Sequence, residues 1–309
     1  MSPPTVFVCG ITGSQGGAVA RSLLHNASIH ALVRDPSSPA AAAISSLGAK
    51  LKLVPGDYAN ESAIRAAMAG CSAAFLNLSP DLTDPGAELR YAMSIIAIAK
   101  EAGIKHMVYA SSLAVNDPER LPNWDPHSPM AVVLRSKQAI EKEVRAAGFQ
   151  NWTILRPGNF MSNYFQPVVR MYAGLAETGR WTTALHPNSV LPMVDVATIG
   201  NFASAAILDP EKFHEQEVEI VDEFLTTPEL MAKLSAAAGR ELQAVYLSDD
   251  EVAEQKKTNP MISVLLMMRD LSIFVDLEKV KSWGIPLSSF EAFLEKEKDR
   301  VLETYKDIL

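Results

Sequence analysis

The sequence contains few cysteines, no long apolar run and no metal-ligand spacing. Only two cysteines, Cys9 and Cys71, occur among 309 residues, which is too few for a disulfide framework. The six histidines are scattered, so no metal site is expected. The longest apolar run, MISVLLMM from Met261, is far too short to span a bilayer. These absences favour a protein with free thiols in a reducing compartment and no membrane partner.

Basic residues are scarce relative to acidic ones. The chain has 28 Lys and Arg against 36 Asp and Glu, a net charge of -8 and no basic block, which argues against direct nucleic-acid binding. The first ten residues show no leader pattern, so we expect the protein in the cytoplasm and, by diffusion, in the nucleus. What is present, 48% hydrophobic and 21% charged residues, is ordinary for a globular protein with a buried core.

Short β-branched and apolar runs alternate with amphipathic segments through the first half of the chain. Strands are predicted at residues 5–8, 29–33, 51–54, 73–76, 106–109 and 152–155. Helices are predicted at 17–24, 61–69, 87–102 and 131–147, and at the alanine cluster 40–43. Alternation at this repeat length implies right-handed crossovers between parallel strands. The predicted fold class is α/β, a doubly wound parallel sheet of the Rossmann type.

The regular alternation stops near Pro157. We therefore expect a dinucleotide-binding domain at residues 1–156 and a smaller mixed α/β substrate lobe at 157–309, partly interleaved with the first. Brief strands are predicted at 189–194, 217–221 and 243–247. A helix over 288–309 carries an apolar stripe that fits either internal docking or a homodimer contact, so the chain is expected to be a monomer or a homodimer. The stripe comprises Phe290, Phe293, Leu294, Val301, Leu302 and Tyr305.

A glycine-rich turn links the first predicted strand to the first predicted helix. Glycines spaced three apart allow a sharp turn, close approach of a diphosphate and tight packing of helix on strand. The helix N-terminus then presents free N–H groups and a positive dipole end to the anion. The residues of this turn are predicted to bind the pyrophosphate of a dinucleotide, and they are Gly10, Thr12, Gly13, Ser14, Gln15 and Gly16.

Arg34 occupies the end of the second predicted strand, where an NAD enzyme normally places an acid for the ribose 2′-hydroxyl. A guanidinium suits a phosphate, so Arg34 favours NADP(H) over NAD by about ten- to a hundredfold. Asp35 would weaken this preference if it turned inward. A solvated arginine at a helix entry is the alternative interpretation of Arg34.

Two further strand ends carry candidate coenzyme contacts. Asp57 follows the third predicted strand, where it either accepts from the adenine amino group or caps the next helix. Asn77, Leu78 and Ser79 end the fourth strand at the carboxyl edge of the sheet, where ligands of such folds bind. These three residues are predicted to pass under the nicotinamide ribose.

Taken in order, seven motifs resemble those of NmrA-like proteins, which are atypical members of the short-chain dehydrogenase/reductase superfamily. The motifs are GITGSQGG, VRDP, GDYAN, YASS, RSKQAIEKEV, LRPGNFMSN and PMVDVATIG, and the resemblance covers residues 6–206. It implies an NADP(H)-binding Rossmann fold with coenzyme contacts in the glycine turn and at Arg34 and Asp57. It also implies nicotinamide contacts near Lys137 and in the loop Pro157, Gly158, Asn159 and Phe160.

The chain departs from the larger superfamily at its catalytic tyrosine. Lys137 is present, but Val133 stands one helical turn earlier, where reductases of that group have a tyrosine that protonates the developing alkoxide. Ser112 matches the superfamily's catalytic serine, although it could equally satisfy backbone groups. Lys137 and Ser112 are the expected catalytic residues, and an exposed role for Lys137 stays open. Substitute proton donors are Asn159, Tyr164 and His127.

Aromatic and methionine side chains are plentiful after Pro157, and they indicate either an apolar substrate pocket or core packing. They are Phe160, Met161, Tyr164, Phe165, Met171, Tyr172, Trp181 and Met193, with Met261, Met267 and Met268 further on. Three functions remain open. The first is an NADPH-dependent reductase of an apolar, conjugated small molecule. The second is a redox-sensing regulator that acts through a protein partner, and the third is a non-redox cyclase or isomerase.

Overall fold

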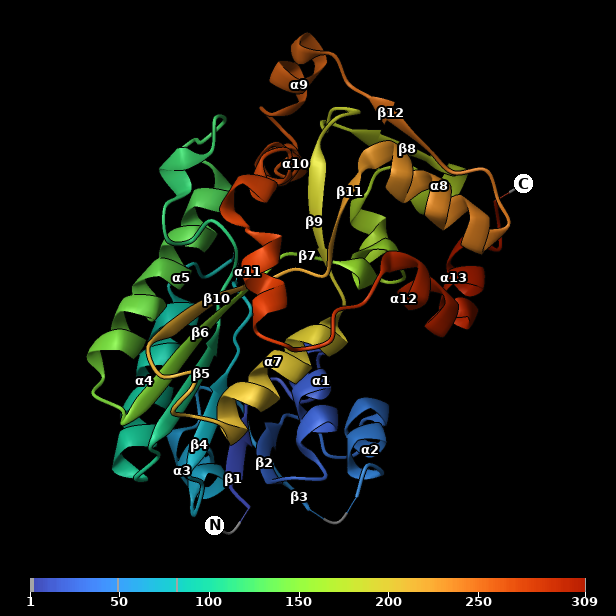
Figure 1. Ribbon diagram of the computed structural model, residues 1–309. Coiled ribbons are helices and arrows are strands. Elements are labelled where there is room, and N and C mark those ends of the chain that lie inside the picture. Colours follow the sequence, from blue (N-terminus) through green and yellow to red (C-terminus); the bar gives the residue numbers. More distant parts are fainter. Residues whose placement is uncertain (1–2, 49, 82, 309) are drawn as a thin grey trace. The chain divides into compact units, whose positions relative to one another are not determined.

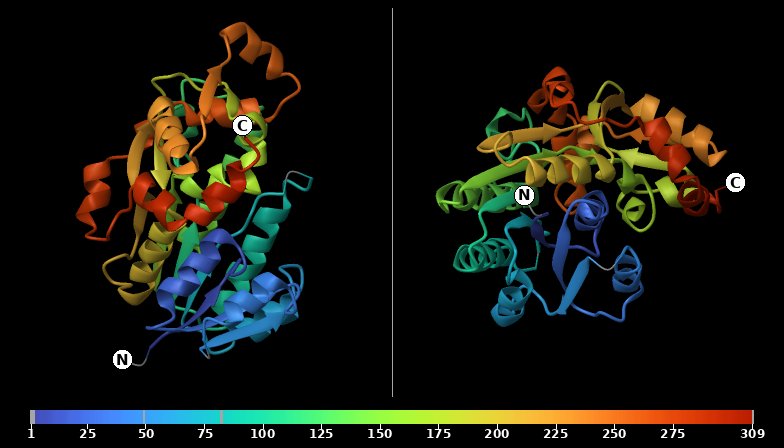
Figure 2. Two further views of the ribbon diagram at one scale, coloured as in Figure 1. Left: turned by 90° about the vertical axis from the view of Figure 1, so that its right-hand side faces the viewer. Right: turned by 60° about the horizontal axis from the view of Figure 1, so that its bottom comes forward.

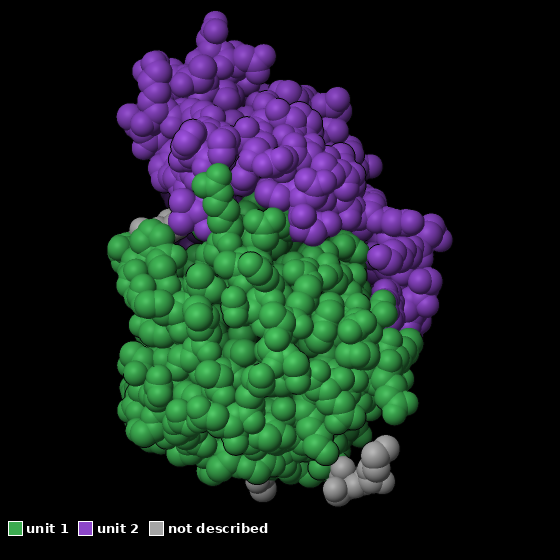
Figure 3. Space-filling view, turned by 90° about the vertical axis from the view of Figure 1, so that its left-hand side faces the viewer, with its two compact units in different colours: residues 1–115, 133–157, 196–220 green, residues 116–132, 158–195, 221–309 purple. Residues whose placement is uncertain are grey.

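The computed structural model describes residues 3–48, 50–81 and 83–308, which form two compact units. Unit 1 contains residues 1–115, 133–157 and 196–220, and unit 2 contains residues 116–132, 158–195 and 221–309 (Figure 3). The chain therefore leaves and re-enters each unit more than once. No helix in the described part of the chain combines the length and the apolarity that crossing a bilayer requires.

Unit 1 is built on a seven-stranded sheet in the order β10-β6-β5-β4-β1-β2-β3, and every neighbouring pair is parallel. This arrangement confirms the predicted doubly wound α/β fold. The strands are β1 (Thr5–Val8), β2 (Ser28–Val33), β3 (Leu51–Pro55), β4 (Ala73–Leu76), β5 (His106–Ala110), β6 (Asn151–Pro157) and β10 (Gln216–Ile220).

Helices cover both faces of this sheet (Figures 1 and 2). They are α1 (Ser14–Leu23), α2 (Pro39–Ser45), α3 (Glu61–Met68), α4 (Ala87–Glu101), α5 (Pro129–Ala146) and α7 (Val196–Leu208). Apolar side chains of α3, α4 and α5 share one buried cluster with the sheet. Helices α1 and α7 pack closely against each other, because Gly200 lies where a Cβ would overlap the backbone of Ala18.

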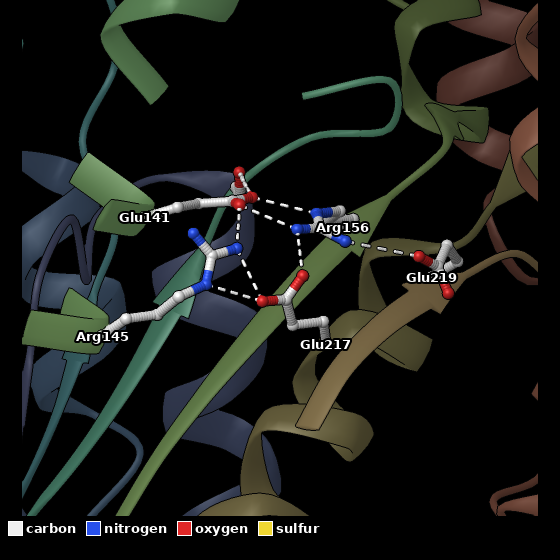
Figure 4. A network of polar contacts seen from close by, with 6 residues as sticks. Glu141, Arg145, Arg156, Glu217 and Glu219 are labelled. Carbon is white, nitrogen blue, oxygen red and sulfur yellow. Dashed lines mark hydrogen bonds and ion pairs between the residues drawn. The ribbon is translucent and has the colours of Figure 1, made fainter. Parts of the chain in front are cut away.

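The seventh strand, β10, is held to the sheet by a buried ion network (Figure 4). Arg156 on β6 is 2% exposed and donates two hydrogen bonds to Glu141 of α5, at 2.9 and 2.7 Å. Its guanidinium also contacts Glu217 and Glu219 of β10, and Arg145 of α5 pairs with both Glu141 and Glu217. These charges lie on β6, α5 and β10. They link residues 216–220 to unit 1, although a long stretch of chain separates this segment from residue 157.

Unit 2 contains a three-stranded sheet, β11-β9-β7, and a two-stranded parallel sheet, β12-β8. Its elements are η1 (Pro118–Arg120), β7 (Asn159–Phe160), η2 (Met161–Tyr164), η3 (Val168–Met171), α6 (Leu175–Thr178), β8 (Arg180–Thr183), β9 (Val190–Val194), β11 (Glu223–Thr226), α8 (Thr227–Ala238), β12 (Gln243–Tyr246), α9 (Asp249–Gln255), α10 (Met261–Met268), η4 (Leu271–Phe274), α11 (Leu277–Ser282), α12 (Phe290–Lys296) and α13 (Lys298–Tyr305). Stacked aromatic rings fill its core, with Tyr164 and Tyr172 centroids 5.2 Å apart.

The single helix predicted over 288–309 is wrong in one respect, because the structure divides it into α12 and α13. Glu297 interrupts the helix with φ -102° and ψ 21°. The break lets most of the stripe turn inward, whereas Leu302 remains 45% exposed. The predicted end of the helix at Leu309 lies outside the described residues. The buried members of the stripe therefore belong to the core of unit 2 rather than to an unpaired surface.

A buried histidine at the amino end of β5 makes stability depend on pH. The Nε2 atom of His106 lies 3.3 Å from the Thr153 hydroxyl, and burial, aided by the charge of His214, lowers the pKa of His106 to about 4. The unfolded chain binds this proton near pH 6.5 but the folded chain does not, so stability present above pH 6.5 is lost as the pH falls towards 4.

We therefore expect the free energy of unfolding to be about 2 kcal/mol lower at pH 5 than at pH 7.5 through this group. His106→Gln, which keeps a donor for Thr153, should remove that part of the pH dependence in urea unfolding. His25→Gln, at an exposed position, is the matched control. An unchanged pH slope in His106→Gln would contradict the assignment.

Candidate functional site

The predicted coenzyme residues of unit 1 meet at one edge of the sheet. The glycine turn follows β1, Arg34 follows β2, Asp57 follows β3 and Asn77 follows β4. Because these strands are parallel neighbours, their carboxyl ends lie together. The strand order reverses between β1 and β4, so the glycine turn and Asn77 flank the topological switch point. This is where open α/β sheets bind their ligands.

The glycine turn is tight and has no room for a side chain at Gly16. Gly10 has φ +62°, and its carbonyl accepts a 2.8 Å hydrogen bond from the Gly13 N–H. A Cβ on Gly16 would overlap the carbonyl oxygens of Gly10 and Cys9. The spacing of glycines in the sequence is thus explained by the close approach of α1 to the end of β1.

The N-terminus of α1 is available to an anion. Its N-cap residue is Gly13, and no side chain of the described residues caps this end. The first-turn N–H groups and the dipole of α1 therefore point towards the carboxyl edge without an internal acceptor. Thr12 and Ser14 are exposed beside this opening.

Gln15 ties the start of α1 to the end of β4. Its side-chain amide donates to the Asn77 Oδ1 atom at 3.1 Å. The Oε1 atom of Gln15 is buried and has no hydrogen-bond partner among the described residues. Next to Asn77, Leu78 is buried and Ser79 is exposed. The structure therefore brings together Gln15 and Asn77, two residues predicted separately as coenzyme contacts, and leaves the Gln15 Oε1 atom as an acceptor without a partner among the described residues.

Tyr58 is a site residue that sequence reasoning missed. Its hydroxyl accepts a 2.6 Å hydrogen bond from the N–H of Gly10, so it fixes the start of the glycine turn. Burial raises the pKa of Tyr58 above its usual range, and burial likewise raises the pKa of the neighbouring Cys9 thiol to about 12. Both groups stay neutral. The only sequence signal was its place directly after Asp57 in GDYAN.

Arg34 does not pair with its acidic neighbour Asp35 within the described residues. Arg34 is exposed, and none of the described residues forms a hydrogen bond or ion pair with it. Asp35 instead accepts from the N–H and hydroxyl of Ser37 at 2.8 and 2.6 Å, and these bonds lower the pKa of Asp35. The carboxylate is thus engaged in its own turn before α2, which leaves the guanidinium unneutralised.

Asp57 does not cap the helix that follows it. The cap of α3 is Asn60, whose side chain accepts from the Ala63 N–H at 3.1 Å. Asp57 accepts from the Ala59 N–H at 3.0 Å and is exposed at the sheet edge. Of the two interpretations of Asp57, the helix cap is therefore wrong, and the adenine contact stays a prediction.

Lys137 lies in a buried ion pair. Its ammonium donates to the Glu88 Oε1 atom at 2.8 Å, so the alternative of an exposed lysine is wrong. Val133, one turn earlier on α5, is half-buried. Ser112 is half-buried and its side chain forms no hydrogen bond within the described residues, whereas the adjacent Ser111 donates to Glu141 at 2.7 Å.

The remaining loop residues fall on both sides of a unit boundary. Pro157 ends the second segment of unit 1, and Gly158, Asn159 and Phe160 belong to unit 2. The Asn159 amide donates to the Tyr164 hydroxyl at 3.1 Å, and Asn159 Oδ1 accepts from Asn163 at 3.3 Å. Tyr164 is fully buried in the aromatic core, and His127 is exposed.

Most of the aromatic residues considered for a substrate pocket are packed in the core of unit 2, since Tyr164, Tyr172 and Trp181 contact one another. A separate shallow hollow, with room for about one water molecule, lies elsewhere in unit 2. Its apolar lining includes Trp124, Met130, Leu266 and Met267, and its polar lining includes Ser128, Ser263 and the Asp125–Lys256 ion pair.

The sheet order, the glycine turn and the uncapped helix at the switch point define a Rossmann-type α/β protein. The chain belongs to the NmrA-like family, whose model matches residues 3–299. This confirms the resemblance inferred from the motifs.

Several characterised proteins are similar to this chain over most of its length. The NmrA-like family domain-containing oxidoreductase notA of Aspergillus sp. (strain MF297-2) is 32% identical over 270 residues, covering 80% of this chain and 77% of notA. The corresponding oxidoreductase malD of Malbranchea aurantiaca is 29% identical over 260 residues, covering 78% of this chain and 75% of malD.

Solved structures share the fold at lower identity. An NADPH-dependent quinone oxidoreductase of Escherichia coli, complexed with NADPH, has a TM-score of 0.72 at 22% identity and covers 94% of this chain and 99% of its own. NmrA, a negative transcriptional regulator in complex with NAD, has a TM-score of 0.71 at 18% identity, with 99% and 96% covered.

The hydrogen bond between Tyr58 and Gly10 should have a measurable effect. Tyr58→Phe leaves the partly buried N–H of Gly10 without this acceptor, so we expect a loss of about 1–2 kcal/mol in the free energy of unfolding. Tyr91→Phe is the control, because the Tyr91 hydroxyl forms no hydrogen bond within the described residues and should change stability by less than about 0.5 kcal/mol. Equal effects of the two changes in urea titrations would refute the role of Tyr58.

Proposed function

We propose that this chain is an NADPH-dependent oxidoreductase that transfers hydride to an apolar, conjugated small molecule. The observation that carries the proposal is the uncapped N-terminus of α1 beside a tight glycine turn, with the unneutralised Arg34 on the same sheet edge. The named oxidoreductases among its relatives support the same activity.

The residues at this edge fit a dinucleotide. The free N–H groups of α1 suit a pyrophosphate, and the absence of a Cβ at Gly16 permits the packing that exposes them. The unpartnered Oε1 atom of Gln15 suits a hydroxyl or amide donor of the coenzyme. These three features favour a ligand that combines phosphate with donor groups.

Arg34 is the residue that favours NADPH over NADH. Similar folds hold either coenzyme, since NmrA is known with NAD and the quinone oxidoreductase with NADPH. A guanidinium can form two charge-assisted hydrogen bonds to a 2′-phosphate. Asp35 does not compete for the guanidinium, because Ser37 occupies its carboxylate.

The missing tyrosine restricts the chemistry. When bound, NADPH supplies a hydride. Lys137 provides a positive charge beside the coenzyme, but Val133 supplies no proton. Acceptors that delocalise the incoming electron pair, such as quinones or enones, depend least on a strong side-chain acid because water can protonate their reduced form.

A second candidate function is redox sensing through a protein partner. Val133 favours it, because a site that binds coenzyme without a catalytic acid can report the NADPH to NADP ratio. Such a regulator must bind its partner with different affinity in the two redox states.

Arg34→Ala tests the coenzyme assignment. Removal of the guanidinium should weaken NADPH binding about ten- to a hundredfold and change NADH binding by less than about threefold. Fluorescence titration of both nucleotides measures this. Arg135→Ala, at an exposed position on α5, is the control and should leave both affinities unchanged. A preserved NADPH preference in Arg34→Ala would disprove the phosphate contact.

A turnover assay separates the reductase from the regulator. We expect oxidation of NADPH when a substituted naphthoquinone or an enone is added, measured as loss of the nicotinamide absorbance, because such acceptors delocalise the incoming electron pair. NADPH binding without turnover of any quinone or enone would contradict the reductase and favour the regulator.

A further inference from the structure

The ion pair between Lys137 and Glu88 is buried. The Lys137 side chain is 10% exposed and the Glu88 side chain is 1% exposed, with 2.8 Å between the Lys137 Nζ and Glu88 Oε1 atoms. The second carboxylate oxygen accepts from the Ser136 hydroxyl at 2.7 Å. Both oxygens of Glu88 are thus held by consecutive residues of α5, which leaves the carboxylate a single orientation.

The position of Glu88 in α4 accounts for its charge. It lies in the first turn of that helix, where the dipole stabilises an anion, and no side chain caps the helix start. A carboxylate buried at this point is therefore compatible with the fold only while its partners are present. The Lys137 ammonium has three N–H donors, and Glu88 takes one of them.

We propose that Glu88 is the positioning residue for Lys137, and that it fixes the ammonium so that its other donors face the hydroxyl groups of the bound nicotinamide nucleotide. The inference rests on the proposed function, since it requires the coenzyme to lie beside Lys137. Glu88 acts only through Lys137. Its neighbour Ser136 acts one step further away, by fixing the carboxylate.

A double-mutant cycle separates positioning from general stability. We expect Glu88→Gln and Lys137→Met each to weaken NADPH binding about ten- to a hundredfold in fluorescence titrations. The double variant should bind as Lys137→Met does, because Glu88 has no other route to the coenzyme. The proposal would be overturned if the two losses of NADPH affinity multiplied in the double variant. It would also be overturned if Glu88→Gln bound NADPH with wild-type affinity.

Two further variants keep the test decisive. Should Glu88→Gln fail to fold, Ser136→Ala replaces it in the cycle, with an expected loss of about threefold that disappears in the Lys137→Met background. Glu219→Gln, in the Arg156 network, controls for loss of a partly buried carboxylate and should leave NADPH affinity unchanged. Wild-type affinity in Lys137→Met overturns the positioning role alone, because the Arg34→Ala titration tests the coenzyme site separately.

Discussion

The site depends on the close approach of α1 to the end of β1. That approach exists only because Gly16 has no side chain to collide with the carbonyls of Gly10 and Cys9. From it follow the position of the helix N-terminus at the switch point, the contact of Gln15 with Asn77 and the hydrogen bond from Gly10 to Tyr58. The backbone, rather than any charged side chain, is therefore the central feature of the proposed anion site.

The buried ion pairs of Arg156 and Lys137 in unit 1 differ in how their hydrogen-bond donors are used. The Arg156 guanidinium on β6 contacts Glu141 of α5 and both Glu217 and Glu219 of β10, so its donors link two further elements to the sheet. The Lys137 ammonium contacts Glu88, which takes one of its three donors. A guanidinium shared among three carboxylates suits a structural junction, whereas an ammonium held on one side suits the binding of a ligand.

Under the proposed function, Val133 separates coenzyme binding from proton transfer. The glycine turn, the exposed Arg34 and the Lys137–Glu88 ion pair form without a tyrosine on α5, so the proposed dinucleotide site does not depend on that acid. This independence is consistent with a fold that includes both oxidoreductases and a transcriptional regulator among its known structures. Under the proposed function, the reaction then depends on the electronic structure of the hydride acceptor as much as on the protein.

The sequence alone determined the six alternating strands of residues 1–157 and the glycine turn, because both are set by local periodicity and by neighbouring residues along the chain. The tertiary structure decided the rest. It placed β10 beside β6, Tyr58 against Gly10 and Glu88 against Lys137, and it broke the last helix at Glu297. These contacts join residues far apart in sequence, and burial and charge pairing, rather than local pattern, select them.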